Sequence, residues 1–285
     1  MLTAVFSPLL LLERLGRIDL SSDFGYATLF VAGRLVSVAA AVATLVAVYL
    51  SGARAFSKRA GLFAAASLAV VAPSVCYSKM ANVDVPYLFW FALSLVFYLR
   101  LLGAPTRGTP AVAQAFRPAT LTRRDLVLFA ASATLAICTK DQAYGLYLAA
   151  PFVIVYAICR ANRDTGAPRP LARAIVDVRL GVAAATAAIL FIACHNLTFN
   201  FGGFIDHVRY ITGSGTTPYR LFEPTFVGRL QLLALTARLD ELSWGWPLWL
   251  VSPVGFVTAI ASPATRRAAV SLALLAISYL SLIHI

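Results

Sequence analysis

Long apolar runs, rich in Leu, Ala and Val and separated by short polar stretches, constrain this chain more than any other feature. A helix that crosses the ~30 Å hydrocarbon core of a bilayer needs about 20 apolar residues, because each helical residue rises 1.5 Å. A strand exposed to lipid would leave its peptide groups unpaired in hydrocarbon. The runs therefore predict an all-α fold, a polytopic bundle of transmembrane helices.

Eight runs are candidate crossings, at residues 26–50, 61–77, 85–102, 126–139, 143–159, 180–197, 244–261 and 268–280. The fourth is short, so we expect it either to tilt or to form a tight hairpin with the fifth. The runs divide the chain into a membrane core at 1–197, an external segment at 198–243 and C-terminal membrane helices at 244–285. Within the external segment, residues 226–239 are predicted to form an amphipathic helix that lies in the membrane interface or packs on the bundle.

Composition excludes a soluble domain and argues against nucleic acid as a partner. Charged residues make up 13% of the chain, against about 25% in soluble domains. The net charge is +12, but the basic residues lie in short loops between apolar runs and form no aromatic-interleaved patch. The cysteines form no CxxC pair, so we expect small buried hydrophobes rather than a disulfide framework or a zinc site. They are Cys76, Cys138, Cys159 and Cys194.

The charged residues are sorted between alternate loops. One set of loops holds Arg54, Lys58, Arg59, Arg107, Arg117, Arg123, Arg124, Arg160, Arg163, Arg169, Arg173, Arg179, Arg266 and Arg267. The opposite short turns hold only Lys79 and Lys140, so the positive-inside rule places the first set in the cytoplasm. Most acidic residues then face outside: Glu13, Asp19, Asp23, Asp84, Asp141, Asp206, Glu223, Asp240 and Glu241. This predicts chemistry on the outer face.

The two ends of the sequence carry separate expectations. Residues 280–285 have the form of a sequencing adapter translated in frame, with an ordinary helix end as the alternative, and we assign His284 no ligand role. The last apolar run stops abruptly, which predicts truncation. The apolar N-terminal stretch has no basic leader and no small-residue cleavage site, so we expect no cleavable signal peptide.

Several short motifs, in a consistent order and spacing, carry a family resemblance. They are Arg34 and Ser37, Tyr49, Gly61-Leu62-Phe63-Ala64-Ala65, Pro73, Ser78, Ala81, Asp84-Val85-Pro86, Thr139-Lys140 and Gly245-Trp246-Pro247. In these positions the chain resembles membrane glycosyltransferases of the C-type fold that use a polyprenyl-phosphate sugar. The nearest families are the bacterial protein O-mannosyltransferase-like and aminoarabinose-transferase-like enzymes. The resemblance covers most of the chain.

The resemblance implies an enzyme of the bacterial cytoplasmic membrane that moves a hexosyl or pentosyl group from its lipid carrier to a glycan, lipid or protein acceptor on the outer face. It implies that Asp84 binds a divalent cation, Mg²⁺ or Mn²⁺, or orients the acceptor, and that Lys140 contacts the carrier phosphate. Family members carry a catalytic acidic residue in a first external loop. Glu13, Asp19 and Asp23 do not resemble that motif, so we expect the catalytic base and one helix upstream of Met1.

The residues themselves leave alternatives open. Asp84 precedes an apolar run and is equally placed to cap a helix. Lys140 contacts phosphate, pairs with the adjacent Asp141, or extends its ammonium to the membrane surface. An arginine in mid-membrane costs at least ~2.5 kcal/mol, so Arg34 should face the bundle interior or a wet cavity, with a phosphate or Asp23 as its partner.

Further candidates for substrate binding are Lys79, Arg209, Arg220 and His195. Structural roles remain open for His195 and His207, and three scattered histidines do not form a zinc site. Two other classes of protein compete with the enzyme: a transporter or lipid flippase, and a fragment without activity of its own. Transporters show inverted repeats and helices broken near mid-membrane, and neither is evident in the sequence.

Overall fold

The structure is a computed structural model that describes residues 2–103, 122–213, 221–223 and 225–283. Every regular element in those ranges is a helix, so the predicted all-α membrane bundle is confirmed. The first helices are α1 (Leu2–Arg14), α2 (Asp23–Ala55), α3 (Lys58–Val70), α4 (Ala72–Ser78), α5 (Asp84–Leu101) and α7 (Arg123–Thr139). They are followed by η1 (Asp141–Ala143), α8 (Tyr144–Tyr147), α9 (Ala150–Asp164), α10 (Pro170–Ile175) and α11 (Val178–Cys194). The last are α12 (Phe201–Thr212), α13 (Phe226–Trp244), α14 (Trp246–Ala261) and α15 (Arg266–Ile283).

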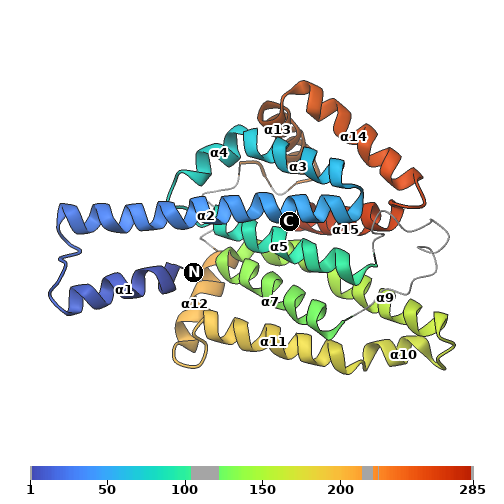
Figure 1. The fold of residues 1–285 in the computed structure, drawn as a ribbon, viewed down its shortest axis with the longest axis horizontal. Helices are drawn as coiled ribbons and strands as arrows, with labels where there is room; N and C mark the ends of the chain where they lie inside the picture. The colour runs from blue at the N-terminus through green and yellow to red at the C-terminus, as the bar shows by residue number, and fades with distance from the viewer. Residues whose placement is uncertain (1, 104–121, 214–220, 224, 284–285) are drawn as a thin grey trace.

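Four helices form the centre of the bundle. Helix α5 packs between α2 and α7, and α7 packs against α11, so the four lie side by side in that order (Figure 1). Their contacts are apolar: Tyr98 and Leu101 of α5 meet Leu126 and Phe129 of α7, and α9 adds Ile158. Many other large apolar side chains point outward, which suits a protein whose surroundings are hydrocarbon rather than water.

Each of the eight predicted crossings coincides with helix. Among the described residues, four stretches are long and apolar enough to span a membrane: Asp23–Ala55, Asp84–Leu101, Asp141–Asp164 and Pro170–Cys194. Two bent pairs, α3 with α4 (66°) and α13 with α14 (113°), raise this number to six if each pair is one span. Helix α7 has 17 residues, or ~26 Å, which is short of ~30 Å. The number of eight crossings therefore stays a prediction.

Helix α2, with α1 beside it, extends at its N-terminal end well beyond the other helices (Figure 1). It has 33 residues, or ~50 Å. The turn before α5 packs on it a third of the way along: a Cβ at Gly33 would lie 2.9 Å from the Cβ of Ala81, and the Asn82 amide donates to Ser37 Oγ at 3.5 Å. The part of α2 from residue 33 onward is ~34 Å long, enough by itself to cross the hydrocarbon core.

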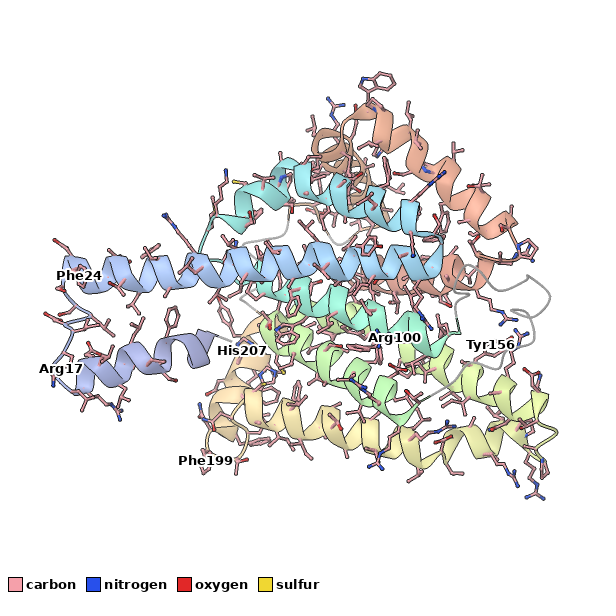
Figure 2. All side chains as sticks on the ribbon, in the orientation of Figure 1. Arg17, Phe24, Arg100, Tyr156, Phe199 and His207 are labelled. Carbon is pink, nitrogen blue, oxygen red and sulfur yellow. The ribbon has the colours of Figure 1, made fainter. Side chains whose placement is uncertain are left out.

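The opposite end of the bundle gathers helix ends that carry basic residues. Ala55, Leu99 and Ala268 form one buried cluster there, and Arg100 pairs with Asp125 at 3.6 Å. Figure 2 shows Arg100 and Tyr156 toward this end, and Phe24 and His207 toward the other. The structure therefore brings the starts of α7 and α15 to the end of α2, as an up-and-down arrangement of crossings requires.

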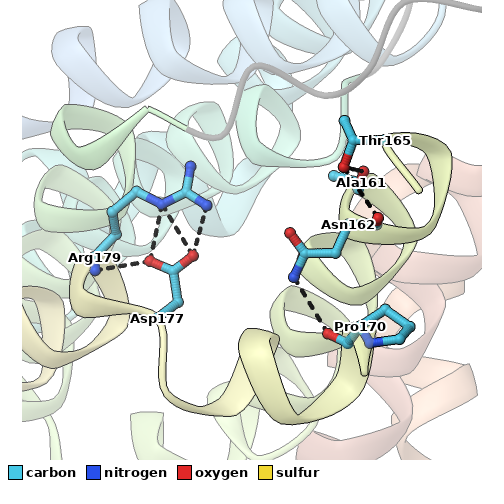
Figure 3. A network of polar contacts seen from close by, with 6 residues as sticks. All are labelled: Ala161, Asn162, Thr165, Pro170, Asp177 and Arg179. Carbon is cyan, nitrogen blue, oxygen red and sulfur yellow. Dashed lines mark hydrogen bonds and ion pairs between the residues drawn. The ribbon is translucent and has the colours of Figure 1, made fainter. Parts of the chain in front are cut away.

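Polar contacts hold the corner from α9 through α10 to α11 (Figure 3). Asn162 Nδ2 donates to the Pro170 carbonyl at 3.2 Å. Asp177 caps α11 by accepting the Arg179 amide at 2.8 Å, and its carboxylate also accepts from the Arg179 guanidinium. These hydrogen bonds help to fix the corner that returns the chain to the bundle.

Two sequence-based expectations about this fold need correction. Residues 226–239 do form helix, within α13, but the apolar and polar side chains of α13 are not sorted onto two faces. The prediction of an amphipathic helix was therefore wrong. Only Cys159 of the four cysteines is buried, whereas Cys76 and Cys194 are exposed. The two exposed thiols lie at helix ends or on a short peripheral helix, where packing is incomplete.

Candidate functional site

An ion pair joins the two residues that the sequence singled out most strongly. Lys140 Nζ donates to Asp84 Oδ1, and the two side chains are 34% and 36% exposed. Lys140 also lies over the ring of Tyr87, with its ammonium 5.8 Å from the ring centroid. Because the pair is neither buried nor fully in solvent, a ligand can reach both charges, and the low local polarity strengthens their attraction.

The Asp84 side chain is available for this pair because Asn82 caps the start of α5 in its place. Asn82 Oδ1 accepts the Asp84 amide at 2.6 Å, and α5 starts at Asp84 with no side-chain cap from Val83. An acidic residue in the first helical turn is also favoured by the helix dipole. The capping alternative for the Asp84 side chain was therefore wrong, and the pattern Asn82-x-Asp84 was the overlooked signal.

The turn after α7 directs adjacent residues to different partners. Helix α7 ends at Thr139, Lys140 adopts an extended backbone (φ −149°, ψ 113°) and η1 begins at Asp141. Asp141 Oδ2 lies 2.9 Å from Nε2 of His207, which α12 carries (Figure 2). The alternative pairing of Lys140 with Asp141 was therefore wrong, because the extended residue separates the two side chains.

His195 lies near the same turn, at the end of α11. Its ring centroid is 4.3 Å from that of Phe191 and 5.3 Å from that of Phe204. Burial lowers the pKa of His195 from its ordinary value; the negative charge of Asp141 opposes this shift, and the neighbouring His207 adds to it. The neutral imidazole is thus the favoured form, held between two aromatic rings.

Acidification should destabilise the protein through His195. In the unfolded chain a histidine binds a proton near pH 6.5, whereas the folded chain, with its lowered pKa, binds it only at lower pH. The unfolded state therefore holds more protons as the pH falls below about 6.5, and the free energy of unfolding decreases. We expect the melting temperature in detergent to fall less between pH 7 and 5.5 in His195→Gln than in the wild type. Equal pH dependence in both proteins would contradict this role of burial.

An apolar cavity of about 400 Å³ opens beside the ion pair. Its walls come from α2, the bent pair α3 and α4, and the start of α5, and Asp84 is the one charged residue among those that line it. The bend between α3 and α4 occurs at Val71, which also lines the cavity. The volume falls in the range of ordinary ligand sites, and the lining combines mostly hydrocarbon with a carboxylate at one place.

The other predicted binding residues do not join the pair. Arg34 is exposed on α2, so the expectation of an interior position was wrong. It follows Gly33, which packs against Ala81 in the turn before α5, and therefore lies near the level of that turn. Lys79 is exposed at the end of α4. Arg209 pairs with Asp206 at 3.5 Å in solvent, and Arg220 lies outside the described residues.

The described residues do not assemble a divalent cation site. No group of three or more His, Cys, Asp or Glu side chains within the described ranges is placed to hold a metal ion. The nearest charge to the Asp84 carboxylate is the ammonium of Lys140, which would repel a cation. The residues around Asp84 therefore do not support the expectation of Mg²⁺ or Mn²⁺ there.

Two tyrosines near the pair were missed in the sequence. The Tyr87 ring lies under Lys140, and Tyr279 of α15 is close enough to interact with the charges of both Lys140 and Asp84. Tyr87 could have been found, since it lies one helical turn after Asp84 on the same face. Tyr279 could not, because its approach depends on how α15 packs against α8.

The fold and this site define a multi-pass helical membrane protein with a charged pair at the edge of an apolar cavity. A family model for dolichyl-phosphate-mannose-protein mannosyltransferases matches residues 27–176, more than half of the 285 residues. The chain therefore belongs to this family of membrane glycosyltransferases, which draw their sugar from polyprenyl-phosphate carriers. The matched range contains both Asp84 and Lys140. No curated protein and no solved structure matches the chain significantly.

Proposed function

We propose that this protein transfers a sugar from a polyprenyl-phosphate carrier to an acceptor on the outer face of a bacterial cytoplasmic membrane. The observation that carries the proposal is the position of the Asp84–Lys140 pair at an apolar cavity. A lipid-phosphate sugar has an anionic head beside a hydrocarbon tail. The cavity wall is apolar apart from Asp84, and the cation of the site, Lys140, is held by Asp84. Family membership favours transfer over transport.

Lys140 is the residue that we assign to the carrier phosphate. An ammonium group has three donors, and Asp84 takes one of them, so two remain for phosphate oxygens. In an inverting transfer the acceptor attacks the anomeric carbon, the bond from that carbon to the phosphate oxygen breaks, and negative charge grows on the leaving phosphate. A fixed cation at that point stabilises the transition state more than the ground state.

Asp84 has two roles in this proposal. Its carboxylate holds Lys140 in place, and its second oxygen is available to accept a hydrogen bond from the acceptor hydroxyl or amine. The family resemblance implies that a different acidic residue takes the proton of the acceptor. Arg34, which is exposed on α2 and does not contact the pair, stays a candidate for phosphate binding.

The orientation of the protein follows from its charges. Arg100 lies at the bundle end that holds the starts of α7 and α15, and His207 lies toward the other end (Figure 2). His207 pairs there with Asp141, whose neighbour Lys140 pairs with Asp84. By the positive-inside rule the Asp84 end faces away from the cytoplasm. His195 we assign to packing on this outer end, since aromatic rings cover its imidazole.

Transfer from a labelled donor tests the function. Membranes that contain the protein should move radiolabelled mannose from a polyprenyl phosphate into an acceptor fraction, and membranes without the protein should not. An unlabelled polyprenyl phosphate should compete, whereas a nucleotide sugar should not. Transfer from the nucleotide sugar alone, or none from the lipid donor despite correct insertion, would contradict the proposal.

Labelling of single cysteines tests the outer location separately. A cysteine placed at Asn82 in a background without the four natural cysteines should react with a membrane-impermeant maleimide in intact cells, and one placed at Arg173 should react only after lysis. If both positions react in intact cells, or neither does before lysis, the two loops share a compartment. The proposed outer site would then be wrong, even for an active enzyme.

A further inference from the structure

Two thiols meet where α7 and α11 end. Cys138 is the residue before the last of α7, Cys194 is the last residue of α11, and the two helices pack against each other. The two thiols are close enough to influence each other, and Cys138 is also close enough to feel the charge of Asp141. The two cysteines are far apart in the sequence, which is why no CxxC spacing reveals them.

The geometry points to a disulfide bond between Cys138 and Cys194 that ties the outer end of α7 to that of α11. A disulfide needs Cα atoms 4.4–6.8 Å apart, a separation that side chains facing each other across packed helices can reach. Cys194 is exposed and Cys138 is partly exposed, so an oxidant can reach them, whereas Cys159 is buried in the core. The inference does not depend on the proposed function.

The reaction needs a two-electron oxidant, for which we name a disulfide of a thiol oxidoreductase. The exposed Cys194, as thiolate, attacks one sulfur of that disulfide, and the oxidoreductase leaves with one thiolate. The Cys138 thiol then attacks Sγ of Cys194 and gives up its proton, and the second sulfur of the oxidoreductase leaves and takes up a proton. The chain loses two protons and two electrons, and the oxidoreductase gains the electrons as two thiols.

The bond would restrain the turn that holds the charged residues. Cys138 is followed by Thr139 and Lys140, and Cys194 by His195. Crosslinking the two helix ends therefore restricts the freedom of the segment from which Lys140 reaches Asp84. Oxidation would rigidify this end of the bundle, and reduction would release it.

Peptide mapping of the oxidised protein tests the bond directly, because trypsin isolates every cysteine. Cleavage after lysine and arginine gives peptides 60–79, 125–140, 141–160 and 180–209, which contain Cys76, Cys138, Cys159 and Cys194 in that order. Purified protein in detergent is treated with diamide, denatured, alkylated and digested. We expect peptides 125–140 and 180–209 as one linked species that separates on reduction, with peptide 141–160 alkylated as a free thiol.

Two variants control the result. Cys76→Ser removes the other exposed thiol and should leave the linked species unchanged on a monomeric chain. Cys194→Ser should leave Cys138 fully alkylated. The proposal is overturned if Cys138 and Cys194 of the folded wild type are still free, and therefore alkylated, after diamide has oxidised Cys76. It is also overturned if the two peptides are linked only between separate chains. Since the wild type alone gives the decisive map, a variant that fails to fold does not obscure the answer.

Discussion

Replacing Lys140 with methionine should weaken the binding of a polyprenyl phosphate by about 10- to 100-fold, because a hydrogen bond to a charged group contributes about 1.5–3 kcal/mol. Methionine keeps most of the side-chain volume and removes the charge that we assign to the carrier phosphate. Binding is measured with the protein in detergent or nanodiscs, and transfer should fall at least in proportion. Lys140→Arg should retain part of the affinity, since the cation remains.

Replacing Asp84 with asparagine should affect a different quantity. The amide leaves Lys140 without its ion-pair partner, so phosphate binding should be unchanged or tighter while transfer falls about tenfold or more. The double variant should deviate from additivity, as expected for side chains in direct contact. Lys58→Met is the control, because Lys58 is exposed at the start of α3, at the other end of the bundle. If Lys140→Met binds the lipid as tightly as the wild type, Lys140 is not the phosphate contact.

Replacing Gly61 with alanine should cause a clear loss of stability, because an added methyl group has no room between α2 and α3. A Cβ at Gly61 would overlap the Tyr49 carbonyl oxygen and would lie 2.6 Å from the Ala53 amide nitrogen. From the other side, a Cβ at Gly52 would lie 2.7 Å from the Gly61 Cα. The backbones of α2 and α3 can approach this closely only through glycine, so we expect a cost of about 1–3 kcal/mol, and more for Gly61→Val.

The matched control is Gly181→Ala in α11, where a Cβ meets nothing within 4 Å. Alanine there should be neutral or stabilising, because it favours helix over glycine by about 1 kcal/mol. The readout is thermal unfolding in detergent, followed by loss of helical circular dichroism. A Gly61→Ala protein that melts at or above the temperature of the wild type would show that α2 and α3 do not pack as described.

Much of the site could be predicted from local sequence signals. Asp84 and Lys140 were identified because each departs from the pattern expected of membrane helices. Asp84 is a carboxylate next to an apolar run, and Lys140 is a cation in a turn on the side that the positive-inside rule leaves poor in cations. Their mutual contact could not be predicted, because it depends on α5 and α7 packing side by side. For the same reason the pairing of Asp141 with His207 could not be predicted, because His207 lies on a helix more than sixty residues away in the sequence.

The misplacement of Arg34 has a different cause. An apolar run was equated with a membrane crossing, and Arg34 lies well inside that run. The helix is ~50 Å long, however, and the turn near Ala81 packs against it at Gly33. Hydropathy alone cannot tell which ~30 Å of a longer apolar helix lies in lipid.

The sequence by itself determined that this protein is a bundle of membrane helices, where most of those helices begin and end, and which charged residues stand at their ends. These properties are local, because hydropathy, helix rise and capping act over a few turns of one segment. Only the tertiary structure decided which charges meet, which surfaces enclose the cavity next to Asp84, and that Cys138 and Cys194 are neighbours. Those contacts join distant segments, and their partners are chosen by helix packing, which no local pattern encodes.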